Sequence, residues 1–187
     1  MEEKIVYFPN VGPENTEEVL SMAKKRAEEL GINSIVVATT VGDTAARAVE
    51  VFKGMNVVAV THNTGFKGAN MQELSDENRK RIEDNGGVIL TTTHMFSGLS
   101  AAMRKKFSTY VVGDIVSNTL RIMGQGMKVV WEISVMAADA GLVRTDEDVI
   151  AIAGTGRGAD MAVVIRPVNS PDFFDMRVKE ILCKPHF

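Results

Sequence analysis

The sequence has little cysteine and no segment that marks it for export or for a membrane. Cys183 is the single cysteine among 187 residues, so no disulfide can form within the chain. This usage is typical of a reducing compartment, and we expect a cytoplasmic protein. The first residues, MEEKIVYF, lack the charge and apolar order of a signal peptide. No apolar run is long enough to span a bilayer, so we expect no membrane partner.

The sequence also lacks an excess of positive charge. Its formal net charge is −3, which argues against a general nucleic-acid binder, and we expect no nucleic-acid partner. The basic runs 24–26 and 104–106 fall within helical patterns and are interpreted as solvated helix faces. The chain is 45% hydrophobic and 24% charged, the balance of a soluble globular protein. Its length suits one domain, which we predict over residues 1–187.

Strand-like and helix-like segments alternate along the chain. Continuous apolar runs predict strands at 4–8, 34–38, 56–60, 87–92, 148–153 and 160–166, with an edge strand at 176–183. Periodic runs predict helices at 16–30, 43–53, 75–85, 98–106, 114–123 and 128–140. This alternation predicts an α/β fold of three layers (α/β/α) around a mostly parallel, doubly wound sheet. Such sheets bind ligands beyond the carboxyl ends of their strands.

The turn at residues 39–44 joins a predicted strand to a predicted helix. A helix N-terminus offers unpaired N–H groups and the positive end of the helix dipole, which attract phosphate. Hydroxyl groups can add hydrogen bonds, and glycine lets the backbone approach an anion closely. The alternative is plain helix capping by Thr40 or Asp43, and the charge of Asp43 opposes anion binding. The candidate phosphate-binding residues are Thr39, Thr40, Val41, Gly42, Asp43 and Thr44.

A glycine-rich segment, AGTGRGAD, follows the strand predicted at 148–153. It formally matches a dinucleotide fingerprint, but a strand-like run follows the glycines where that fingerprint requires a helix. We therefore interpret it as a connection between two strands, either a flexible turn or a ligand contact in which Arg157 binds phosphate. The candidate residues are Gly154, Thr155, Gly156, Arg157 and Gly158.

Histidines follow two of the predicted strands. His62 and His94 are expected at one edge of the sheet. A metal site would need a carboxylate or a third histidine at ligand spacing, which the sequence lacks, so we predict no metal. The two histidines act as a general acid or base, contact a ligand, or simply form hydrogen bonds to a loop. Phe66 and Phe96, which lie in the same loops, either pack in the core or face the ring or sugar of a ligand. The corresponding candidates are Thr61, His62, Phe66, His94 and Phe96. Gly126 and Lys128 open a further helix and are candidates too, or simply form a corner between helices.

The stretch SIVVATTVGDTAARAVEVFKGMNVVAVTH resembles the C-terminal domain of pyruvate kinase. In that family a hydroxyl-rich turn of the pattern Thr-x-Ser-Gly-x-Thr-Ala binds a phosphate of a sugar-bisphosphate effector, and a later glycine-rich loop holds the other end. The resemblance places that turn on residues 39–44 and the loop on residues 154–158. Asp43 stands where the family commonly has a basic residue.

Nearly the whole chain resembles small stand-alone prokaryotic proteins, chiefly archaeal, that are similar to this kinase domain. The matching segments are ENTEEVL, THMFSG, GQGMKVVWEI, MAADAGL and RGADMAVVIRP. The resemblance implies flavin mononucleotide (FMN) or a similar phosphorylated small molecule at the strand ends. Three functions stay open: an FMN-binding protein, a flavin-dependent oxidoreductase with His62 or His94 as proton donor, and a regulatory effector-binding module without catalysis. The apolar helical face at 133–140 predicts a homo-oligomer.

Overall fold

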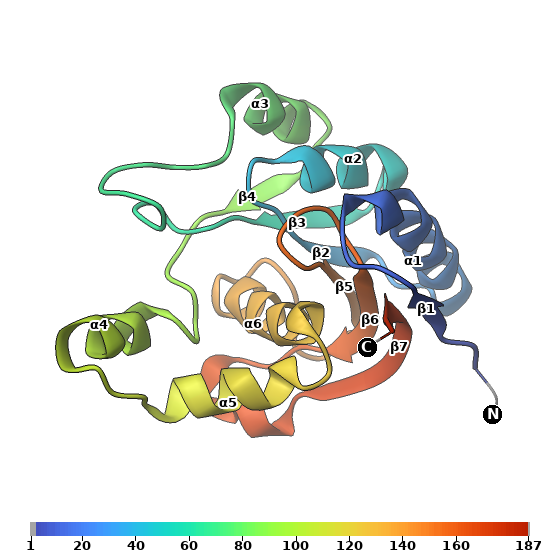
Figure 1. Ribbon diagram of the computed structural model, residues 1–187. Helices are drawn as coiled ribbons and strands as arrows, with labels where there is room; N and C mark the ends of the chain where they lie inside the picture. Colours follow the sequence, from blue (N-terminus) through green and yellow to red (C-terminus); the bar gives the residue numbers. More distant parts are fainter. Residues whose placement is uncertain (1–2, 187) are drawn as a thin grey trace.

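The computed structural model describes residues 3–186, which form one seven-stranded sheet covered by helices (Figure 1). The strands are β1 (Val6–Phe8), β2 (Ser34–Ala38), β3 (Asn56–Val60), β4 (Val88–Leu90), β5 (Val149–Ala153), β6 (Met161–Arg166) and β7 (Arg177–Pro185). The α-helices are α1 (Thr16–Leu30), α2 (Asp43–Val51), α3 (Asp76–Asp84), α4 (Gly98–Phe107), α5 (Val112–Arg121) and α6 (Gln125–Asp139). Two short 3-10 helices are η1 (Pro13–Asn15) and η2 (Ser170–Asp175).

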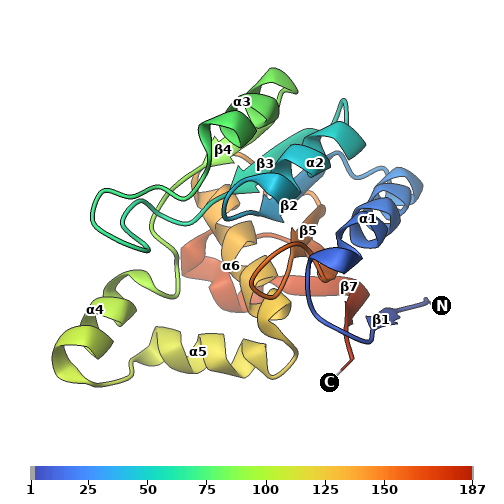
Figure 2. The same cartoon turned by 45° about the horizontal axis from the view of Figure 1, so that its top comes forward.

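The sheet is mostly parallel, with strand order β1-β7-β6-β5-β2-β3-β4. Only the pairs β5–β6 and β6–β7 are antiparallel, so β6 is the reversed strand. Helices α1, α2 and α3 cover one face of the sheet, and α6, α5 and η2 lie on the other (Figure 2). The predicted three-layer α/β architecture is therefore confirmed.

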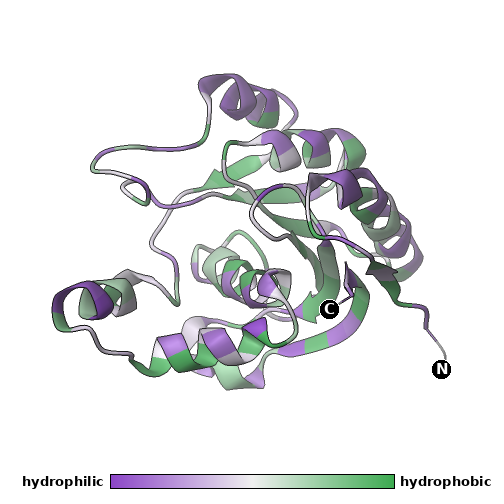
Figure 3. Cartoon of the chain, in the orientation of Figure 1, coloured by the Kyte–Doolittle hydropathy of each residue, from purple (hydrophilic) through white to green (hydrophobic). Residues whose placement is uncertain are grey.

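Alternating side chains of the strands divide the core into two halves. Ile35 and Val37 pack under α1 and α2, whereas Val36 between them packs under α6. A strand buried on both faces needs apolar residues at every position, which explains the continuous apolar runs in the sequence. Figure 3 shows these strands as the most uniformly hydrophobic part of the chain, and α3 as one of the most hydrophilic helices.

The C-terminal strand differs from its predicted place. Residues 176–183 were predicted to form an edge strand, but β7 lies inside the sheet, between β6 and β1. The very short β1 pairs along its outer side, with Val6 opposite Cys183. Burial in this position raises the pKa of the Cys183 thiol to about 12, so the thiol is unreactive near neutral pH.

Helix α6 begins three residues earlier than predicted and runs through the core. Its apolar side chains at 133 and 135–138 are buried against the sheet, chiefly against β5 and β2. These residues were the reason for predicting self-association, and their burial within one chain removes that reason. Within residues 3–186, no helix combines the length and apolar character needed to cross a membrane.

Candidate functional site

A cavity of about 1540 Å³ opens at the carboxyl ends of the central parallel strands. Ala38, Val60 and Gly154, at the ends of β2, β3 and β5, lie in its wall. The first residues of four helices also line it: Thr16 of α1, Asp43 of α2, Gly98 of α4 and Gln125 of α6. Because each helix N-terminus carries partial positive charge, this arrangement favours an anionic ligand.

The N-terminus of α2 is built on a glycine. Gly42 is the N-cap residue, and no side chain accepts a capping hydrogen bond there. Its φ of 109° favours glycine, and a Cβ at this position would lie 2.4 Å from Cβ of Asn78. The alternative of capping by Thr40 or Asp43 is therefore not realised. The first N–H groups of α2 are left for another acceptor.

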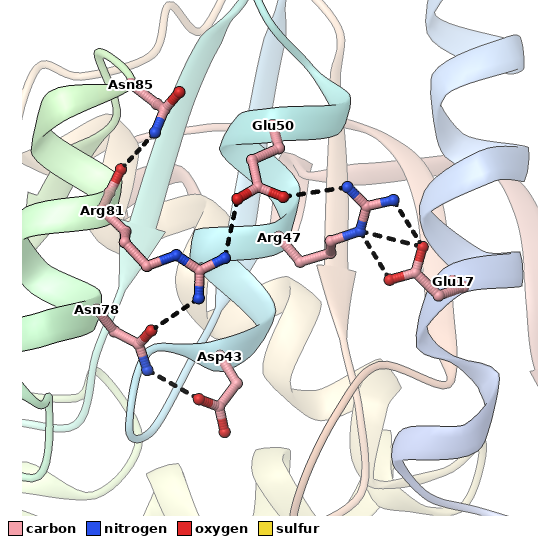
Figure 4. A network of polar contacts seen from close by, with 7 residues as sticks. All are labelled: Glu17, Asp43, Arg47, Glu50, Asn78, Arg81 and Asn85. Atoms are coloured by element: carbon pink, nitrogen blue, oxygen red, sulfur yellow. Dashed lines mark hydrogen bonds and ion pairs between the residues drawn. The ribbon is translucent and has the colours of Figure 1, made fainter.

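The carboxylate of Asp43, which opposed anion binding in the sequence, is engaged by a neighbouring helix (Figure 4). Nδ2 of Asn78 in α3 donates to Oδ1 of Asp43 at 2.8 Å and to the carbonyl oxygen of Val41 at 3.2 Å. The same amide thus fixes the turn and draws the negative charge towards α3. This contact eases the electrostatic objection to a phosphate at residues 39–44.

Two arginines beside this turn are held by carboxylates (Figure 4). Arg47 pairs with Glu17 of α1 at 2.8 Å and with Glu50 at 3.1 Å. Arg81 of α3 pairs with Glu50 at 2.8 Å. These exposed ion pairs link α1, α2 and α3 in a row along the rim of the cavity. Most of their positive charge is already balanced before a ligand enters.

The glycine-rich loop joins β5 to the antiparallel strand β6, as predicted, and is not part of a dinucleotide-binding unit. The loop packs against the start of α1 and forms a hydrogen bond with it. A Cβ on Gly158, whose φ is 70°, would lie 2.3 Å from Cα of Pro13. The N–H of Ala159 donates to Oγ1 of Thr16 at 3.0 Å, and Oδ2 of the buried Asp160 accepts from Thr155 N–H at 3.0 Å.

Arg157 differs from the other cations that line the cavity. Its side chain is exposed and makes no ion pair or hydrogen bond with any residue in the described range, and only its backbone N–H donates, to the carbonyl oxygen of Thr155 at 3.0 Å. By contrast, Arg104 pairs with Asp114, and Nε of Arg121 donates to Gln125 at 2.8 Å. Arg157 is therefore the cation best placed to neutralise a ligand's phosphate.

Aromatic rings form a cluster at the ends of β3 and β4. Phe66 is 51% exposed and stacks on His62, with ring centroids 4.0 Å apart and planes at 28°. His62 contacts His94 edge to face at 5.5 Å, and its Nδ1 lies 2.7 Å from Oε2 of the carboxylate of Glu73. This hydrogen bond, with help from Lys67, holds the pKa of Glu73 below its usual value. The exposed ring of Phe66 offers a flat surface to a ligand.

Behind this cluster lies a buried polar network on the cavity wall. Glu132 of α6 is 2% exposed and pairs with Lys128, one helical turn earlier and 6% exposed. Its other oxygen accepts from the N–H of Phe96 at 3.0 Å. His94 donates from Nε2 to the carbonyl oxygen of Thr61 at 3.2 Å, and its Nδ1 lies 3.9 Å from Oε2 of Glu132. Burial lowers the pKa of both His94 and Lys128, against the raising effect of Glu132.

Most of the candidate residues from the sequence meet at this cavity. Those in its lining are Thr39, Thr40, Val41, Asp43, Thr44, Thr61, His62, Phe66, His94, Lys128, Gly154, Gly156, Arg157 and Gly158. Gly42, Phe96, Gly126 and Thr155 lie outside the lining. The ring of Phe96 is buried against Phe173, and Gly126 sits where a Cβ would come within 2.6 Å of Met161. These two residues therefore serve packing.

The sequence analysis did not identify Glu132, Arg47 or Arg81 as residues of the site. A four-residue spacing between Lys128 and Glu132 on a helix was a usable signal for the pair. Nothing local indicated that the pair would be buried, because burial depends on the packing of α6 under β2 and β5.

The lowered pKa of His94 predicts a pH-dependent stability. Unfolded histidine titrates near pH 6.5, so below that pH the unfolded chain binds a proton that folded His94 resists. We expect the free energy of unfolding to fall with falling pH in this window, by up to about 1.4 kcal/mol per pH unit. Urea unfolding of wild type and His94→Gln between pH 7 and pH 5 measures it. The free energy of unfolding should fall more with falling pH for the wild type than for the variant. If it falls equally in both proteins, the pKa of His94 is not lowered by folding.

Comparison with known proteins gives one family and several solved structures. The family model described as pyruvate kinase, alpha/beta domain, matches residues 17–165. Two structures of pyruvate kinase from Cryptosporidium parvum align over 82% of this chain, each at 14% identity and a TM-score of 0.43. One of them is a complex with ADP. The chain covers only 23% and 24% of those two kinase chains, so it spans about a quarter of their length.

Proposed function

The chain belongs to the pyruvate kinase alpha/beta domain family, and from this premise we propose that it binds a phosphorylated small molecule, with FMN as the first candidate. The ligand's phosphate binds at residues 39–44, and the glycine-rich loop with Arg157 closes over it. The observation that carries the proposal is the N-terminus of α2, which opens into the cavity without a side-chain cap while Asn78 holds the carboxylate of Asp43.

The residues of the cavity suit FMN in three respects. The N-terminus of α2 and Arg157 provide N–H groups and positive charge for a phosphate. Phe66, half exposed and stacked on His62, provides a face for a flat ring. The volume of about 1540 Å³ exceeds what most small ligands require, so a ring, a chain and a phosphate fit together. When bound, a flavin supplies electron or hydride transfer.

The test of this proposal is a visible absorption spectrum of freshly purified protein, followed by mass spectrometry of any ligand released on denaturation. A flavin spectrum and a released mass equal to that of FMN support it. A colourless protein that also fails to bind added FMN contradicts the choice of FMN. Sugar phosphates and other nucleotides would then be tested at the same turn.

Arg157 provides a prediction that separates binding from folding. Arg157→Ala should weaken FMN binding roughly tenfold, because a charge-assisted hydrogen bond to phosphate contributes about 1.5–3 kcal/mol. The melting temperature of the unliganded protein should stay nearly unchanged, since this side chain is exposed and makes no ion pair or hydrogen bond with described residues. Isothermal titration and thermal unfolding measure the two effects. A large fall in the unliganded melting temperature would mean that Arg157 is structural.

A flavin-dependent oxidoreductase is the second candidate, favoured by one observation. His94 lines the cavity, and its Nδ1 can take up a proton from the network of Glu132 and Lys128 behind it and pass that proton to a group bound there. Bleaching of bound flavin by a reductant, followed by reoxidation by an added acceptor, supports this version. Binding without redox turnover favours a binding protein or a regulatory module.

We also propose that the protein is cytoplasmic. We propose further that it self-associates, through α4 and α5 and not through the buried face of α6. Ile115 and Ile122 of this region are 63% and 80% exposed, and no residue of α4 is buried. Such unpartnered apolar side chains are typical of an interface with a second copy. The wild type should have a mass in solution of at least two chains of 20.3 kDa each. The double variant Ile115→Glu with Ile122→Glu should have the mass of one chain. Sedimentation equilibrium measures both, and a monomeric wild type would refute the interface.

A further inference from the structure

Lys128 carries the one side-chain amine that residues 3–186 place on the wall of the cavity. The other basic side chains in the described lining, apart from the two histidines, are the guanidinium groups of Arg47, Arg81, Arg104, Arg121 and Arg157. A guanidinium stays protonated and does not act as a nucleophile, whereas a buried lysine can lose its proton and react with a carbonyl group. Lys128 has only 8% of its side chain exposed and still borders the cavity.

We propose that Lys128 forms an imine with a phosphorylated aldehyde or ketone bound in this cavity. The inference rests on the phosphate-binding part of the proposed function, because the turn at residues 39–44 would hold the phosphate of such a compound. It differs in the chemical class of the ligand, which carries a carbonyl group and need not contain a flavin.

The phosphate-binding turn and Lys128 belong to the two different helix layers, one on each face of the sheet. The phosphate-binding turn leads into α2, which belongs to the layer of α1 and α3, whereas Lys128 comes from α6 on the other face (Figures 1 and 2). One cavity reaches both, since its lining includes the turn and Lys128 together. A ligand held by its phosphate can thus present its other end to the amine.

Glu132 is positioned to take the proton that the amine must lose. Its Oε2 pairs with Nζ of Lys128, and the N–H of Phe96 fixes the other carboxylate oxygen at 3.0 Å. After the proton moves to Glu132, the neutral amine attacks the carbonyl carbon and forms a carbinolamine. One proton returned by Glu132 and one proton shed by the amine nitrogen leave with the carbonyl oxygen as water. The products are the protonated imine, which faces the carboxylate of Glu132, and one water molecule, with no oxidant or reductant required.

His94 extends this proton path towards solvent. Its Nε2–H is committed to the carbonyl oxygen of Thr61, so in the neutral ring Nδ1 is free to accept a proton, 3.9 Å from Glu132. His62 lies edge to face with His94 and is less buried. Burial also lowers the pKa of Lys128, which favours the neutral, reactive amine.

Pyridoxal 5′-phosphate is a suitable probe, because it carries a phosphate and an aldehyde on a flat ring. The intact protein is incubated with it near pH 7, reduced with borohydride, digested and analysed by mass spectrometry. We expect Lys128 to be the main modified residue. Pyridoxal, which lacks the phosphate, should modify Lys128 at least about tenfold more slowly. Lys128→Arg, which keeps the charge facing Glu132, should abolish this modification, whereas Lys80→Arg on the exposed face of α3 should leave it unchanged.

Two outcomes overturn the proposal. One is modification confined to surface lysines, with Lys128 intact in a folded protein; the other is equal modification of Lys128 by pyridoxal, because the phosphate would then play no part. The test is independent of FMN. If FMN fails to bind but Lys128 is modified with phosphate dependence, the FMN assignment fails and the imine stands. If FMN binds and Lys128 stays unmodified by the free probe, the imine fails and the FMN assignment stands.

Discussion

Lys128→Met is expected to lower the free energy of unfolding by about 3–5 kcal/mol. The substitution removes the cation that faces Glu132, whose side chain is 3% exposed, and leaves a buried carboxylate without its charge partner. The remaining hydrogen bond from Phe96 N–H satisfies only one of the two carboxylate oxygens. Urea unfolding followed by circular dichroism measures the loss.

The control for this prediction replaces both members of the pair. Lys128→Met with Glu132→Leu should recover most of the lost stability, since a buried ion pair replaced by apolar residues of similar volume is often neutral or stabilising. Lys128→Arg should lose much less than Lys128→Met. If the single methionine variant is as stable as the wild type, then the pair is solvated and Lys128 is not the buried group described here.

Thr40→Val combined with Thr44→Val is expected to weaken FMN binding at least about 100-fold and to leave riboflavin binding nearly unchanged. Each hydroxyl would donate to the phosphate, and a hydrogen bond to a charged group contributes about 1.5–3 kcal/mol. Both side chains line the cavity, and valine preserves the shape of the buried Thr44. Riboflavin lacks the phosphate, so it reports any general damage to the cavity. Isothermal titration with both ligands measures the difference.

A matched control is available outside the site. Thr145→Val changes an exposed threonine just before β5, at the end of that strand remote from the glycine-rich loop. It should alter neither dissociation constant. An equal loss of FMN and riboflavin binding in the double variant would mean that the hydroxyls act on the fold of the turn and not on a phosphate.

The fold was predictable from the sequence where burial is uniform. The central strands β2, β3 and β5 are apolar at nearly every position, and each matches its predicted range within one residue. The place of β7 was not predictable in the same way. Exposed and half-buried residues alternate only over its first four positions, and it lies inside the sheet because the three residues of β1, far away in the sequence, pair along its outer side.

The site was predictable where a parallel sheet brings loops together. The turn at 39–44 and the glycine-rich loop at 154–158 were expected at the carboxyl ends of strands in one sheet. Both loops line the cavity, because β2 and β5 are parallel neighbours. The role of Asn78 was not predictable, since it depends on the docking of α3 beside α2. Nor was the burial of Glu132, which follows from the packing of α6 against the sheet.

The most direct measurement is a pair of dissociation constants, for FMN and for riboflavin, with the same preparation of wild-type protein freed of any bound ligand. A phosphate held by the N-terminus of α2 and Arg157 predicts that FMN binds at least about tenfold more tightly than riboflavin. Equal affinities for the two compounds, or no binding of either, would contradict a site for phosphorylated flavin at residues 39–44.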